Sequence, residues 1–164
     1  MRCFRRWIGG LAGGLALLVV GCSAHDPPPL GNPANGDSGL QCTPGKTLAD
    51  GFYTLQNSSH QTVTVTSVRL IGGVGQEMTS PAYLVPIAHT TLIGLNYWPV
   101  RWPTWKDRRR VPATIAPHTT TNLVFAQTRT SDHPKSATIQ VNYTAGGNSY
   151  TMIEVTRVLV AVKC

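Results

Sequence analysis

The alternation of apolar and polar residues with a period of two is the feature that most restricts the fold of this chain. Val63 and Val65 alternate with threonines, and Ile139, Val141 and Tyr143 alternate with other polar residues. Successive side chains of a strand point to opposite faces of a sheet, so this pattern predicts strands with one buried face. Beyond the first 21 residues no run follows the helical period of 3.6, and Glu and Lys are scarce. The sequence therefore predicts an all-β protein.

The strands that this pattern predicts are short, rich in Thr and Val, and separated by turn residues at intervals of about ten. They cover residues 52–55, 62–70, 83–87, 90–95, 111–115, 119–128, 138–143 and 150–162. A change of parity between Val65 and Val68 predicts a bulge near Ser67, and Gly146-Gly147-Asn148 predicts a hairpin turn. About seven or eight such strands favour an antiparallel, immunoglobulin-like β-sandwich, with a closed barrel as the alternative that the sequence leaves open.

The N-terminus has the composition of an export signal. Arg2, Arg5 and Arg6 make a positive start, and residues 8–20 form an apolar run without a charge. That run is shorter than the roughly 20 apolar residues of a membrane-spanning helix. The sequence leaves open whether the general secretory route or the twin-arginine route carries the chain.

Val19-Val20-Gly21-Cys22 closes this apolar run and resembles the lipobox of bacterial lipoprotein precursors. The resemblance implies cleavage before Cys22, acylation of its thiol with chains such as palmitate, and attachment to the extracytoplasmic face of the cell membrane. Two or more acyl chains would give durable anchoring. In style, the whole chain resembles uncharacterised lipoproteins of high-GC Gram-positive bacteria, which often pair a Pro/Gly tether with a small all-β ectodomain. No functional residue beyond Cys22 follows from that resemblance.

Composition divides the chain into three parts. Residues 1–21 are expected to be the signal peptide, residues 22–48 a lipidated cysteine with a Pro/Gly-rich tether, and residues 49–164 one β-sandwich domain.

The four cysteines fit an exported protein. Cys3 falls in the signal peptide and Cys22 is the predicted lipid carrier, which leaves Cys42 and Cys164. Two thiols outside the cytoplasm predict a disulfide that closes nearly the whole domain into one loop. Two unrelated free thiols are the alternative.

Residues 97–110 combine three of the four tryptophans with a dense positive cluster. The five cations of this segment and Asp107 give it a net charge of +4. The mature chain also has a net charge of +4, from eleven Lys plus Arg against seven Asp plus Glu. The positive character is therefore local. The residues predicted to form a contact surface are Trp98, Arg101, Trp102, Trp105, Arg108, Arg109 and Arg110.

Two prolines, Pro99 and Pro103, predict that this segment is a loop or an extended edge. If it is extended, Trp98 and Trp102 share one face with Val100, whereas Tyr97 and Arg101 point the other way. Tryptophan beside arginine suits phospholipid headgroups, an anionic envelope polymer or an envelope protein. Nucleic acid is not expected, because the compartment is wrong and one cluster makes no groove.

The competing interpretation of this segment is structural. Trp98 and Trp102 would then plug an end of the sandwich, with residues 108–110 as a solvated flank.

The sequence does not predict an enzyme, a cofactor or a metal site. It lacks a nucleophile elbow and a zinc-protease motif, and its acids are widely spaced. The histidines of the predicted domain fall at expected turns or strand ends and are interpreted as exposed turn residues; they are His60, His89, His118 and His133. A copper site that joins one of them to Met78 or Met152 is a less favoured hypothesis.

These observations predict a membrane-anchored cell-envelope lipoprotein whose non-catalytic sandwich binds or scaffolds an envelope partner. The alternative is an extracytoplasmic carrier of a small ligand or metal, with a pocket between the sheets or at the loop histidines.

Overall fold

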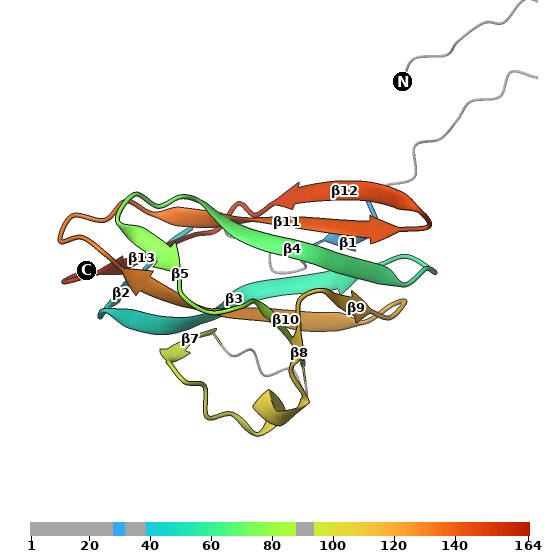
Figure 1. Ribbon diagram of the computed structural model, residues 1–164, viewed down its shortest axis with the longest axis horizontal. Coiled ribbons are helices and arrows are strands. Elements are labelled where there is room, and N and C mark those ends of the chain that lie inside the picture. Colours follow the sequence, from blue (N-terminus) through green and yellow to red (C-terminus); the bar gives the residue numbers. More distant parts are fainter. Residues whose placement is uncertain (1–27, 32–38, 88–93) are drawn as a thin grey trace, which may run out of the picture.

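The computed structural model describes residues 28–31, 39–87 and 94–164, and these residues form a β-sandwich (Figure 1). The described strands belong to two separate sheets, so the predicted all-β sandwich is confirmed and the barrel alternative is not adopted. The predicted signal peptide, Cys22 and part of the strand predicted at residues 90–95 lie outside the described residues.

The first sheet has the order β1-β3-β10-β6-β8, with β7 also paired to β3 and β5 also paired to β10. Its strands are β1 Leu30–Gly31, β3 Thr47–Asn57, β5 Gln76–Met78, β6 Tyr83–Pro86, β7 Gly94–Tyr97, β8 Arg109–Arg110 and β10 Thr120–Arg129. All of these pairings are antiparallel.

The second sheet has the order β2-β13-β11-β4-β9, with β12 also paired to β11. Its strands are β2 Leu40–Pro44, β4 Val63–Gly72, β9 Ala113–Ile115, β11 Ala137–Ala145, β12 Asn148–Ile153 and β13 Arg157–Ala161. The pair of β13 and β2 is parallel, so this sheet is mixed.

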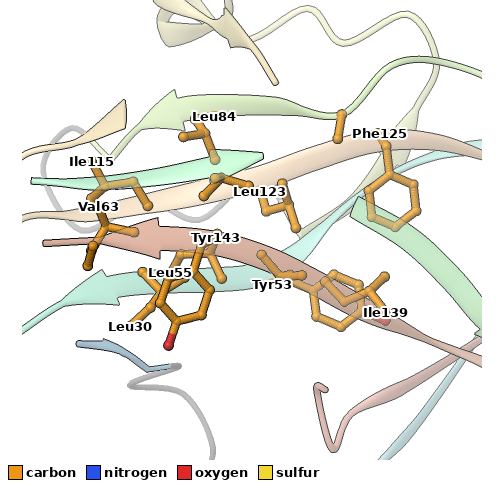
Figure 2. Packing of buried hydrophobic residues seen from close by; sticks show 14 of the residues in the cluster. Leu30, Tyr53, Leu55, Val63, Leu84, Ile115, Leu123, Phe125, Ile139 and Tyr143 are labelled. Carbon is orange, nitrogen blue, oxygen red and sulfur yellow. The ribbon is translucent and has the colours of Figure 1, made fainter. Parts of the chain in front are cut away.

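The main core lies between the two sheets and is built from the inward positions of both (Figure 2). Strand β11 shows the predicted alternation along its whole length, with every second residue buried. Tyr53 from β3 stacks against Phe125 from β10, with ring centroids 6.2 Å apart. Burial of these apolar surfaces is the main source of stability for such a fold.

The predicted bulge and hairpin are both present. Between β4 and β11, Ser67 pairs with Asn142 and Val65 pairs with Tyr143, which leaves Thr66 as the extra residue. Its hydroxyl donates a hydrogen bond to the Asn142 carbonyl at 3.0 Å. The hairpin of β11 and β12 turns through Gly146 and Gly147, and positive φ at both positions explains the two glycines.

Three boundaries differ from the sequence prediction. The body begins before residue 49, because β1, β2 and the start of β3 pair within the sheets although their composition resembles a tether. The strand predicted at residues 150–162 is interrupted at residues 154–156, where the chain passes from β12 to β13. The strand predicted at residues 111–115 begins only at Ala113, because Pro112 cannot donate a ladder hydrogen bond.

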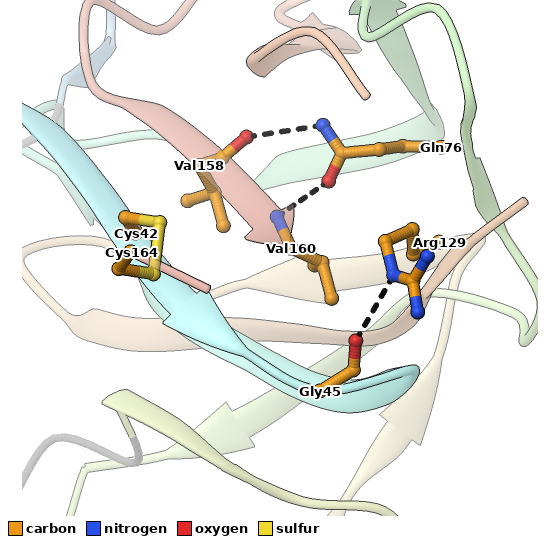
Figure 3. Close-up of a disulfide and its surroundings, with 7 residues drawn as sticks. All are labelled: Cys42, Gly45, Gln76, Arg129, Val158, Val160 and Cys164. Atoms are coloured by element: carbon orange, nitrogen blue, oxygen red, sulfur yellow. Dashed lines mark hydrogen bonds between the residues drawn. A yellow bond between two sulfur atoms is a disulfide. The ribbon is translucent and has the colours of Figure 1, made fainter. Parts of the chain in front are cut away.

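The C-terminal end of the fold is fastened in two ways (Figure 3). Cys42 and Cys164 form the predicted disulfide, which joins residues 122 positions apart at the β2 and β13 edge. Gln76 of β5 acts across the sheets: its side-chain oxygen accepts from the Val160 N–H at 2.7 Å and its amide nitrogen donates to the Val158 carbonyl at 3.4 Å. The Gln76 amide thus makes the hydrogen bonds to β13 that the backbone of a neighbouring strand would make. These bonds connect the first sheet to the second.

Candidate functional site

Residues 97–110, here called the Trp/Arg segment, lie against the outer face of the first sheet (Figure 1). The segment leaves β7, passes through the short 3-10 helix η1 (Pro103–Asp107) and enters β8. Pro103 stands at the start of η1, where its missing N–H costs no hydrogen bond. The Trp105 N–H donates to the Trp102 carbonyl at 3.0 Å and closes the turn.

A second apolar cluster forms where the Trp/Arg segment meets the sheet. Ala49, Val85 and Val124 point outward from β3, β6 and β10, and all three are buried. Val100 of the segment is only 4% exposed in this cluster. The half-buried aromatic residues that pack around it are Tyr83, Trp98, Trp102 and Trp105. The segment therefore covers a sheet face that would otherwise expose apolar side chains to water.

Trp105 is the centre of the aromatic contacts. Its ring meets Trp98 at 5.7 Å and Tyr83 at 5.2 Å, both edge to face. The Arg108 guanidinium lies 4.9 Å from the Trp105 centroid and 5.7 Å from the Tyr83 centroid, within the range of cation–π attraction. Arg108 also donates to the Trp105 carbonyl at 2.9 Å. Arg108 therefore belongs to the cluster although its side chain is exposed.

The other cations of the segment point into solvent. Arg101, Lys106, Arg109 and Arg110 are exposed, and Arg109 and Arg110 are positioned by the pairing of β8 with β6. Among the described residues, the salt bridge that forms joins Arg129 to Asp132. None of the described carboxylates therefore lies within 4.0 Å of these four cations. The exposed cations of the segment therefore form a positive surface around the half-buried aromatic side chains.

The predicted division of the segment into two faces is confirmed. Trp98, Val100 and Trp102 face the sheet, whereas Tyr97 is 89% exposed and Arg101 is also exposed. A cavity of about 340 Å³ lies on the outer side and is lined by Asn96, Tyr97, Trp98, Pro99 and Arg101. The tryptophans do serve as packing material, as the competing interpretation held, but on a sheet face instead of an end of the sandwich.

The outward-facing cluster was not predicted from the sequence, although a signal for it exists in β10. Leu123-Val124-Phe125-Ala126 is an unbroken apolar run, and all four residues are buried. An unbroken run is typical of a strand that is covered on both faces. A period of two alone places only Leu123 and Phe125 on the buried face of this strand and does not account for the burial of Val124.

Two histidines that the sequence separates meet in the structure. His60 lies in the turn after β3, and His118 lies in the turn before β10. The His60 Nδ1 and the His118 Nε2 are 3.0 Å apart. Both are exposed turn residues, as is His133, whereas His89 lies outside the described residues. Met78 and Met152 pack against the main core. Among the described residues, no group of three or more His, Cys, Asp or Glu is gathered for a metal ion.

A buried acid lies in the core. Asp50 is 0% exposed, its Oδ1 accepts from the Phe52 N–H at 3.2 Å, and no described group bonds its Oδ2. Burial raises the pKa of Asp50 to about 7, against a smaller opposing effect of the Phe52 hydrogen bond. Burial, together with Asp50 and Glu154 nearby, also raises the pKa of Tyr53.

Comparisons with known proteins gave no match to a protein-family model, to a curated protein or to a solved structure. No helix in the described part of the chain is long and apolar enough to cross a membrane.

Proposed function

We propose that this protein is a membrane-anchored lipoprotein of the bacterial cell envelope, held by lipid on Cys22, whose non-catalytic sandwich binds an envelope partner through the Trp/Arg segment. The observation that carries the proposal is a set of exposed cations that have no carboxylate partner among the described residues, namely Arg101, Lys106, Arg109 and Arg110. Arginines presented in this way favour a partner with negative charge, either an anionic envelope polymer or the acidic face of an envelope protein.

The packing of the segment supports recognition by an ordered surface. Val100 and the three tryptophans fasten the chain to the sheet, and β8 pairs with β6. A partner would therefore meet cations on an ordered backbone, and less entropy would be lost on binding than with a loose loop. The open cavity beside Tyr97 and Arg101 adds a place for an aromatic or aliphatic group of that partner.

A sedimentation experiment with isolated envelopes tests the proposal. The full chain carries Cys22→Ser, so that no acyl chain contributes to binding. In this background, Arg109→Ala with Arg110→Ala is compared with Arg157→Ala with Lys163→Ala, which removes the same charge from exposed positions outside the segment. We expect the first variant to lose most of its envelope binding and the control to keep it, and we expect high salt to weaken binding. Equal binding by the two variants would contradict the proposal.

A further inference from the structure

The turn after β3 and the turn before β10 bring two imidazoles together at one end of the sandwich. His60 and His118 are 58 positions apart in the chain, and their rings meet edge to face with centroids 4.7 Å apart. The His60 Nδ1 and the His118 Nε2 lie 3.0 Å from one another, and both side chains are accessible to solvent. We propose that these two nitrogens form a chelating site for a late first-row divalent cation of the class Cu²⁺, Ni²⁺ and Zn²⁺.

The separation of the two nitrogens matches that of two ligands on one cation. Metal–imidazole bonds are about 2.0 to 2.1 Å long, so two nitrogens on one ion lie about 2.9 Å apart at a right angle and about 3.3 Å apart in a tetrahedron. Both rings lie in exposed turns and rotate out of their mutual hydrogen bond to point both lone pairs at one ion. The hydrogen bond between the rings is then replaced, and the ring that donated it carries its proton on its other nitrogen, without a change in the charge of either ring.

Asn57 fixes the two turns relative to one another. Its buried amide donates to the Gln61 carbonyl at 2.7 Å in the first turn, and to the Ile115 and Ala116 carbonyls at 3.1 Å on the way to the second. Its oxygen accepts from the Ser59 N–H at 3.0 Å, next to His60. One side chain therefore bonds the backbone of both histidine-bearing turns, so the two turns keep one arrangement before any cation arrives.

The backbone at His118 supports a specific role for this turn. His118 has a φ of 54°, and it is the one residue other than glycine with positive φ in the described part of the chain. Such a conformation is uncommon outside glycine and costs energy, and it persists where the surroundings fix it. Here it coincides with the contact between the rings.

Two imidazoles favour nitrogen-binding cations over Ca²⁺ and Mg²⁺, which prefer oxygen. Among the favoured cations, Cu²⁺ forms the tightest complexes. The remaining coordination positions face solvent and are open to water or to a ligand from a partner. The inference does not depend on the proposed function, because neither histidine belongs to the Trp/Arg segment.

Calorimetric titration with Cu²⁺ alone tests the site in the full chain. Cys3→Ser and Cys22→Ser are introduced first, so that only the disulfide cysteines remain. His60→Gln and His118→Gln are compared with His133→Gln, an exposed histidine in another turn. Circular dichroism checks that each variant keeps its fold.

We expect one Cu²⁺ to bind per chain, with an affinity that falls roughly tenfold or more in either pair variant and stays unchanged in the His133→Gln control. The electron paramagnetic resonance spectrum of the wild-type complex should show coupling to nitrogen, and His118→Gln should reduce that coupling. The inference is overturned if Cu²⁺ does not bind, if the wild-type complex shows no coupling to nitrogen, or if both pair variants bind as the control does.

Discussion

Replacing Asp50 by Asn is expected to stabilise the protein at neutral and alkaline pH and to leave it unchanged in acid. Asp50 is fully buried, and its pKa of about 7 compares with 3.8 for an ordinary Asp. Well below pH 4 both the native and the unfolded chain hold this proton. Between about pH 4 and 7 the native chain holds a proton that the unfolded chain has released, so stability falls as the pH rises. Above pH 7 the full cost of a buried charge remains.

The size of this effect follows from the two pKa values. Each pKa unit corresponds to about 1.4 kcal/mol, so the rise at Asp50 amounts to roughly 4 kcal/mol of lost stability at pH 8. Asparagine has the shape of the protonated acid, keeps the oxygen that accepts from Phe52 and carries no charge. We therefore expect Asp50→Asn to exceed the wild type by up to about 4 kcal/mol at pH 8 and by less than about 1 kcal/mol near pH 4.

Urea unfolding followed by circular dichroism between pH 4 and 8.5, with the disulfide intact, measures this difference. Asp132→Asn is the control, because Asp132 is exposed and its ion pair with Arg129 lies at the surface; we expect it to change stability by about 0.5 kcal/mol or less. A difference between Asp50→Asn and the wild type that stays constant across this pH range would refute the reasoning, as would an asparagine variant that is the less stable one at pH 8.

Two further predictions concern the fastened end of the sandwich. Replacing Cys42 and Cys164 by Ser opens a loop of 122 positions and is expected to lower the free energy of unfolding by about 4 to 5 kcal/mol, and an unchanged denaturation midpoint would contradict this. Gln76→Ala is expected to cost about 1 to 3 kcal/mol, because the Val160 N–H and the Gln127 amide both lose their acceptor. Hydrogen exchange at Val160 should then accelerate in that variant, whereas unchanged protection would show that β13 does not need the Gln76 amide.

The fold could be predicted where the sequence shows which face of a strand is exposed to solvent. Strand β11 has one polar face, so its alternation, the bulge in β4 and the hairpin to β12 followed from period and turn residues. Strand β2 could not be predicted, because its short run between prolines and glycines has the composition of a linker. Its place is fixed by parallel pairing with β13 and by the disulfide, and both depend on residues more than 100 positions away.

The candidate sites could also be predicted only in part from the sequence. Local composition placed the aromatic and positive residues of the Trp/Arg segment in one loop, and the two prolines with a period of two predicted its faces. What the loop covers could not be read locally, because Val85 and Val124 come from two other strands. The contact of His60 with His118 has no local signal at all, since each is a lone histidine in its own turn.

The packing of the Trp/Arg segment links stability to the proposed binding surface. Strands β3, β6 and β10 carry apolar residues on their outer face, and the chain must cover them to avoid an exposed apolar patch. The tryptophans that do so are bulky, so the backbone between them is held near the sheet, and Arg108 is drawn onto the Trp105 ring. Arg109 and Arg110 follow at once in β8, where backbone pairing positions them and their side chains make no ion pair with a described carboxylate. The packing that completes the fold therefore also presents the cations, which can be changed individually without disturbing the aromatic cluster beneath them.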